Sequence, residues 1–232
     1  MQWLRAFLLG ALLVLGVAAA PQPAQALTVF TVNSNLDFAL KTPGSTQCIA
    51  TNDQCTLRAA VQAANNLPLQ QVRIVLQANT TYTLTIEGRD EDNGATGDLD
   101  LNNHITIVGG GGNREADPSG TIIQAGPIPT MGIDRVFAVN AHWSTPVHVA
   151  FEALTVRNGN LTSTNYETGY GAAIDFEASG NGTLNIYNVI FESNRTTMDG
   201  GALALINSGG NAGAAVTIDR ATFRNNQADI WG

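Results

Sequence analysis

Short apolar runs, separated by turns rich in Gly, Asn and Asp, dominate the chain after residue 70. Five of these runs alternate apolar and polar residues or are continuously apolar, as β-strands do. They are VRIVL (Val72–Leu76), YTLTI (Tyr82–Ile86), HITIVG (His104–Gly109), TIIQA (Thr121–Ala125) and RVFAV (Arg135–Val139). No amphipathic helical segment lies between them, so the pattern argues against a doubly wound α/β fold.

The C-terminal half of the chain repeats itself. Three segments align at spacings of 35 and then 32 residues: VAFEALTVRNGN (Val149–Asn160), LNIYNVIFESNR (Leu184–Arg195) and VTIDRATFRNNQ (Val216–Gln227). The alignment places Val156, Phe191 and Phe223 at one position, and Asn194 and Asn226 at another, where the first copy has Gly159. Between the copies, YGAAIDF (Tyr170–Phe176) matches DGGALAL (Asp199–Leu205).

A period of this length, built of strands and glycine-rich turns, predicts stacked units that cannot bury their apolar faces alone. We therefore expect an all-β chain folded as a parallel β-helix, a solenoid of about five or six coils. Stacking of equivalent positions would build an apolar ladder inside and an asparagine ladder at a turn.

The stretch QCIATNDQCTLRAAVQAANN (Gln47–Asn66) contains a short run with helical periodicity. Thr56 is a suitable N-cap, and the apolar residues at i, i+3, i+4 and i+7 that follow it are Leu57, Ala60, Val61 and Ala64. The first unit of a stacked array exposes unpaired backbone, so we expect this helix to cover it. Residues 27–68 are predicted to form an N-terminal cap, and residues 69–232 the array, incomplete at its C-terminus.

The N-terminus predicts export. Residues 1–5 are a short basic start, residues 6–20 are nearly all apolar, and Ala24-Gln25-Ala26 is a small-x-small cleavage pattern. We interpret residues 1–26 as a signal peptide for the Sec pathway, so the mature protein is expected to be secreted or displayed at the cell surface. No later apolar stretch is long enough to span a membrane.

The two cysteines, Cys48 and Cys55, are predicted to form a disulfide, as expected for an exported chain. Metal binding by two thiolates without a nearby His is the poorer alternative, because zinc usually takes four N or S ligands.

Net charge bears on the choice of partners. The formal charge is −8, and loss of Arg5, the one charged residue of the signal peptide, takes it to −9. Such a surface repels nucleic acid and anionic membranes, so neither is an expected partner.

The acidic loop EGRDEDNGATGDLD (Glu87–Asp100) is the best candidate for a metal site. Its carboxylates Asp90, Asp92, Asp98 and Asp100 are the oxygen ligands that calcium prefers. The run lacks the EF-hand pattern, and a solvated loop without metal is the alternative. No other cofactor is predicted.

Candidate catalytic groups are sparse. The signatures of pectate lyases and polygalacturonases are absent, and Asp175 and Asp199 are interpreted as solvated charges at turns. The histidines His104, His142 and His148 have no Ser, Cys or carboxylate constellation around them in the sequence, so surface or strand-edge positions are expected. Trp143 and Trp231 could stack on a sugar or cover the core.

Several motifs resemble a known family. CTLRAAVQAANN resembles the CSLREA motif near the N-terminus of exported bacterial β-helix proteins, although Ala59 stands where that motif has Glu. GDLDLNNHITIVGGG (Gly97–Gly111), IDRVFAV (Ile133–Val139) and LTVRNG (Leu154–Gly159) resemble the same family. Phe191–Asn194 with Gly200–Leu203 resembles the repeats of polymorphic outer-membrane proteins. The resemblance implies a right-handed parallel β-helix of pectate-lyase-like architecture, here truncated at the C-terminus.

The sequence favours a non-catalytic exported protein that functions in adhesion or in binding surface glycans, an expectation that depends mainly on the resemblance. A polysaccharide-active lyase or hydrolase and a purely structural fragment are the alternatives. A groove with three or more carboxylates within reach of each other would favour the enzyme, and a flat Asn/Thr face would favour binding. The ligand and the oligomeric state are not predicted.

Overall fold

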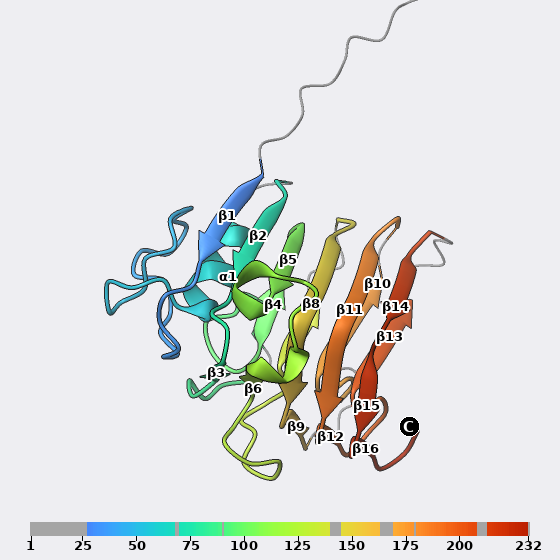
Figure 1. Cartoon of the computed structure of the whole chain (residues 1–232). Helices are drawn as coiled ribbons and strands as arrows, with labels where there is room; N and C mark the ends of the chain where they lie inside the picture. The colour runs from blue at the N-terminus through green and yellow to red at the C-terminus, as the bar shows by residue number, and fades with distance from the viewer. Residues whose placement is uncertain are drawn as a thin grey trace, which may run out of the picture.

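The computed structural model in Figure 1 describes residues 27–67, 70–89, 91–139, 145–162, 169–178, 180–207 and 213–231. The predicted signal peptide, residues 1–26, lies outside the described residues. The described chain consists mainly of short parallel strands, with one α-helix and two short 3-10 helices, η1 (Gly110–Gly112) and η2 (Pro118–Gly120).

The largest sheet has nine strands, all paired in parallel. Its main path runs through β1 (Thr28–Thr31), β2 (Val72–Val75), β5 (Ile105–Val108), β8 (His148–Arg157), β11 (Thr183–Glu192) and β14 (Ala215–Asp219). These six strands lie side by side in Figure 1, from blue to red. The remaining strands, β3 (Thr80–Thr83), β6 (Thr121–Gln124) and β15 (Thr222–Arg224), branch from that path through β8 and β11.

Two smaller parallel sheets complete the fold. The four-stranded sheet contains β4 (Leu99–Leu101), β7 (Phe137–Val139), β10 (Ile174–Ala178) and β13 (Leu203–Asn207). The three-stranded sheet contains β9 (Asn160–Leu161), β12 (Arg195–Thr196) and β16 (Gln227–Ala228). One apolar core joins inward side chains of the nine-stranded and four-stranded sheets, as in the contact of Phe137 with Phe151 at 4.8 Å between ring centroids.

The predicted helix is confirmed as α1 (Leu57–Asn65), which contacts β2 and β4 near the N-terminal edge of the sheets. Thr56 is the N-cap, and its hydroxyl accepts a hydrogen bond from the Ala59 N–H at 3.2 Å. All four residues of the predicted apolar stripe are buried. The sequence therefore predicted the start of this helix and its apolar stripe, but Arg58, Ala59 and Ala63 are buried as well.

The internal repeat is confirmed residue by residue. Parallel pairing places Val156, Phe191 and Phe223 in one register, and the rings of the two phenylalanines stack at 4.9 Å. The asparagine ladder is also present: the side-chain oxygen of Asn194 accepts from the Gly159 N–H at 3.0 Å, and that of Asn226 accepts from the Asn194 N–H at 3.1 Å.

The prediction of an all-β, right-handed parallel β-helix is wrong. The described strands form three parallel sheets of nine, four and three strands, the largest of them an open half-barrel, rather than a solenoid. The repeat that motivated the prediction begins only at β8; before it, β3 and β6 branch from the main path and α1 interrupts the strands. Unequal connections in this N-terminal half prevent its strands from recurring at a fixed period.

The individual strand predictions succeed better than the architecture. The strands β2, β5, β6 and β7 lie within the predicted runs. The run Tyr82–Ile86 is displaced, because β3 begins at Thr80 and ends at Thr83.

The predicted disulfide between Cys48 and Cys55 is present, with the two Cα atoms 5.1 Å apart. Replacing both cysteines by serine is expected to lower the free energy of unfolding by about 2.5 kcal/mol, because the short loop becomes unconstrained in the unfolded chain. Urea denaturation monitored by circular dichroism measures this. A reducing agent should lower the wild-type midpoint to that of the variant and leave the variant unchanged; equal midpoints without reductant would contradict the prediction.

Candidate ligand-binding groove

The outer face of the nine-stranded sheet carries rows of side chains that run across the strands. Alternate residues of each strand point into the core, so the residues between them point outward. The first row contains Gln71, His104, His148 and Thr183. The second contains Arg73, Thr106, Ala150, Asn185 and Thr217, and the third Val75, Val108, Glu152, Tyr187 and Asp219.

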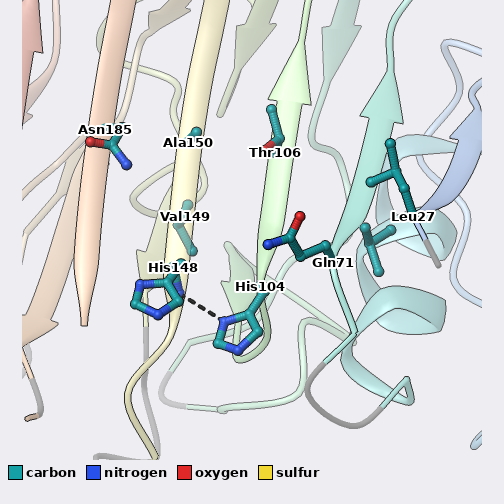
Figure 2. A pocket seen from close by; sticks show the side chains of 9 residues that line it. Leu27, Gln71, His104, Thr106, His148, Val149, Ala150 and Asn185 are labelled. Carbon is teal, nitrogen blue, oxygen red and sulfur yellow. Dashed lines mark hydrogen bonds between the residues drawn. The ribbon is translucent and has the colours of Figure 1, made fainter. Parts of the chain in front are cut away.

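Two adjoining depressions lie along these rows. One, of about 150 Å³, lies beside the first row (Figure 2). The other, of about 390 Å³, reaches the third row. Ala150 and Asn185 line both depressions, so the two form one shallow groove over β5, β8, β11 and β14.

Two histidines mark one end of the groove. The rings of His104 and His148 stack with centroids 4.8 Å apart and planes 25° apart. The backbone N–H of His148 donates to Nδ1 of His104 at 3.0 Å, the dashed line in Figure 2. Nδ1 of His148 lies 3.0 Å from the Thr183 hydroxyl. Burial lowers the pKa of His104, and the neighbouring His148 lowers it further.

A tyrosine surrounded by charges marks the other end. The guanidinium carbons of Arg114 and Arg220 lie 3.8 and 5.0 Å from the ring centroid of Tyr187. The Tyr187 hydroxyl donates to Glu115 at 2.6 Å, and this bond is the main reason that the pKa of Glu115 is lowered. Glu152 pairs with Arg114 at 3.6 Å, so the charges at this end are largely matched.

The floor of the groove between the two ends consists of small side chains, most of them polar. Thr106, Ala150, Asn185 and Thr217 supply it, and Asn185 is exposed. Of the large exposed apolar side chains in the described residues, Leu27 lines the first depression and Ile218 lies on β14, whereas none lies on β5, β8 or β11. Over these three central strands a ligand must therefore bind mainly through hydrogen bonds and ring contacts.

A separate cluster of charged side chains lies on the four-stranded sheet. Arg135 pairs with Asp98 at 3.1 Å and also with Asp175. Burial is the main reason that the pKa of Asp100 is raised to about 8 and that of Asp175 to about 6; Asp100 is 1 % and Asp175 2 % exposed. Burial likewise raises the pKa of half-buried Glu177 to about 8. The interpretation of Asp175 as a solvated turn charge is therefore wrong.

The predicted calcium ligands are only partly described. Asp90 lies outside the described residues, Asp92 is exposed, and Asp98 and Asp100 are buried. The Gly94 N–H donates to Asp100 at 2.6 Å. The described part of the chain contains no group of three or more His, Cys, Asp or Glu side chains placed to hold a metal ion. The calcium site stays a prediction.

The structure describes only some of the histidines and tryptophans that the sequence analysis named. His104 and His148 are brought together, whereas His142 and Trp143 lie outside the described residues. Trp231 is 74 % exposed, and its backbone N–H donates to the Asp199 carboxylate.

The sequence interpretation missed the groove, but two signals for it were available. The aligned repeats place Ala150, Asn185 and Thr217 at one position, directly after an inward apolar residue. The segments HITI and HVAF share the same pattern, which would have paired His104 with His148.

Comparison of the chain with protein-family models, with curated proteins and with solved structures gives no match, so the fold and the groove carry the functional argument alone.

Proposed function

We propose that the protein is a non-catalytic exported or cell-surface protein that binds an extended polysaccharide in the groove. The observation that carries the proposal is the floor of small, mostly polar side chains across neighbouring strands, with rings at both ends. Neighbouring strands of a sheet lie about 4.8 Å apart. A chain-like ligand that lies across the strands would therefore follow the rows and meet the next side chain of a row at each strand.

The composition of the groove favours a glycan over a protein partner. Protein interfaces have a core of large apolar and aromatic side chains, whereas over β5, β8 and β11 of the described chain this face carries no large exposed apolar side chain and its tyrosine, Tyr187, is only half-exposed. The amide of Asn185 and the hydroxyls of Thr106 and Thr217 both donate and accept hydrogen bonds, as sugar hydroxyls require. The balanced charges around Tyr187 are compatible with a polar ligand.

The disulfide supports the proposed location outside the cytoplasm. The Cys48–Cys55 disulfide is typical of proteins that fold in oxidising compartments. Among the helices of the described residues, none has the length and apolar character needed to cross a membrane.

Filling the groove should weaken binding of the glycan. A glycan array followed by calorimetry identifies and quantifies the ligand, and Ala150→Trp is expected to weaken it by at least about tenfold, because Ala150 lines both depressions. Asn185→Ala removes one exposed amide and should weaken binding about three- to tenfold.

The matched control is Ala78→Trp, which adds the same side chain at an exposed position between β2 and β3. It should bind like the wild type, and melting temperatures check that all three variants fold. Binding to no glycan, or unchanged affinity in both groove variants, would reject the proposal.

A polysaccharide-active enzyme is the second candidate, and the carboxylate cluster favours it. Glu177, with a pKa of about 8, would be protonated at neutral pH, as a general acid must be. Against it, Asp98, Asp100 and Asp175 are each at most 6 % exposed. Release of reducing or unsaturated ends from bound polysaccharide, lost in Glu177→Gln, would establish this alternative.

A further inference from the structure

The histidine end of the groove presents two ring nitrogens to a ligand. Because Nδ1 of His104 accepts the backbone N–H of His148, neutral His104 carries its proton on Nε2. Nδ1 of His148 is engaged with Thr183, and the described structure gives neither Nε2 atom a hydrogen-bond partner. Stacking holds the two rings side by side at the end of the depression in Figure 2.

Uncharged side chains surround the pair in the described structure. The polar residues beside it are Gln71 before β2, Thr106 on β5 and Thr183 on β11, none of which titrates near neutral pH. The nearest charged residues along β2 and β8 are Arg73 and Glu152, which pair with each other at 3.4 Å. A proton taken up by the pair is therefore not neutralised by an adjacent carboxylate.

We infer that the groove recognises an acidic polysaccharide, with a sugar carboxylate held by the Nε2 atoms of His104 and His148, and that binding tightens as the pH falls. The inference rests on the proposed function and names its ligand class. The chain is acidic overall, but the charged residues beside the groove pair with one another, so the local charge does not oppose an acidic ligand as the net charge would. A hexuronate carboxylate is fully ionised above about pH 5, whereas histidine takes up its proton between about pH 5 and 8.

The geometry determines where the charge develops. Protonation of His104 at Nδ1 breaks the bond to the backbone N–H, so this ring stays a neutral Nε2–H donor. His148 is exposed, and burial of its stacked neighbour lowers the pKa of His104, so the adjacent ring stays uncharged. A charged imidazole at this end of the groove would form a charge-assisted hydrogen bond to the carboxylate, and such bonds are about twice as strong as neutral ones.

Calorimetry with oligogalacturonate and its methyl ester tests the inference, because the sugar chain is the same and esterification replaces the charged carboxylate by a neutral group. Between pH 7.5 and 5.5 we expect the wild type to bind oligogalacturonate about tenfold more tightly, and the methyl ester with less than a twofold change. His148→Gln keeps a polar side chain without a titratable group, so its affinity for oligogalacturonate should change less than twofold over this range.

The net charge of the protein also becomes less negative on acidification, and His148→Gln controls for this because it retains every other titrating group. A pH dependence that persists in this variant would overturn the inference. So would equal pH dependence for both probes, or binding of the methyl ester alone, and both of these results would leave glycan binding in the groove intact. Failure of both probes and of every array glycan would instead overturn the proposed function.

Discussion

Arg58→Met is expected to lower the free energy of unfolding by about 3–5 kcal/mol, because it leaves buried partners without their donor. Arg58 is 1 % exposed, and its guanidinium donates to both carboxylate oxygens of Asp37 at 2.7 and 3.2 Å. Its other hydrogen bonds go to the carbonyl oxygens of Gly94, Gly97 and Asp98 at 2.8–3.1 Å. One side chain therefore joins α1 to the loop that precedes β4.

Domains of this size are stable by only about 5–15 kcal/mol, so the loss would leave Arg58→Met marginally folded. Urea denaturation at 25 °C measures it. Arg224→Met is the control, because Arg224 is half exposed and pairs with Glu192 at the surface; we expect it to cost less than about 1 kcal/mol. An Arg58→Met midpoint close to that of the control would refute the role of Arg58.

Arg58→Lys refines the test by keeping the charge but losing the planar fork. A lysine ammonium has three donors and cannot bind Asp37 through two parallel hydrogen bonds while reaching the loop carbonyls. Its stability should therefore lie between those of the wild type and Arg58→Met.

The N-terminal helix shows how far the sequence carries the fold. Hydrophobic periodicity and Thr56 predicted α1 and its buried face, because helix geometry and capping are local. The role of Arg58 was not predictable, since its partners lie 21 to 40 residues away and are mostly backbone carbonyls. Ala59, which replaces the glutamate of the resembling motif, is fully buried beside Leu40 and Ala50, where a carboxylate would be costly.

The repeat predicted the register but not the architecture. Apolar residues and asparagines recur at fixed spacing from Val149 on, and stacking of equivalent positions follows directly from that. The spacing cannot show how the N-terminal strands branch, because residues 84–98 and 125–136 connect strands without any repeated pattern. The extension of a local repeat to the whole chain caused the incorrect β-helix prediction.

The histidine pair and the carboxylate cluster differ for a related reason. His104 immediately precedes β5 and His148 begins β8, so alternation and the register of these paired strands would have predicted their contact. The burial of Asp100 and Asp175 depends on what covers the outer face of the four-stranded sheet, which strand periodicity does not reveal. From the sequence alone, a buried carboxylate near a glycine-rich turn cannot be distinguished from a solvated one.

Burial of these carboxylates makes stability depend on pH. Lowering the pH from 8 to 5 is expected to raise the melting temperature. An aspartate in the unfolded chain has a pKa near 3.9, whereas the pKa of Asp100 in the folded protein is about 8, so the folded state holds a proton that the unfolded state releases. The stabilisation from this proton is full below about pH 4 and is lost as the pH rises toward 8, at up to about 1.4 kcal/mol per pH unit.

Asp100→Asn isolates this contribution. The amide oxygen can still accept the Gly94 N–H, but the side chain no longer ionises. The variant should melt higher than the wild type at pH 8 and at nearly the same temperature at pH 5, because the wild-type carboxyl group is protonated there. Asp53→Asn is the control, because Asp53 is 71 % exposed and should leave the pH profile unchanged. If the two profiles stay parallel between pH 5 and 8, or if Asp100→Asn is less stable at pH 8, Asp100 is ionised in the folded protein. Arg135 would then compensate the charge of Asp100 as well as those of Asp98 and Asp175.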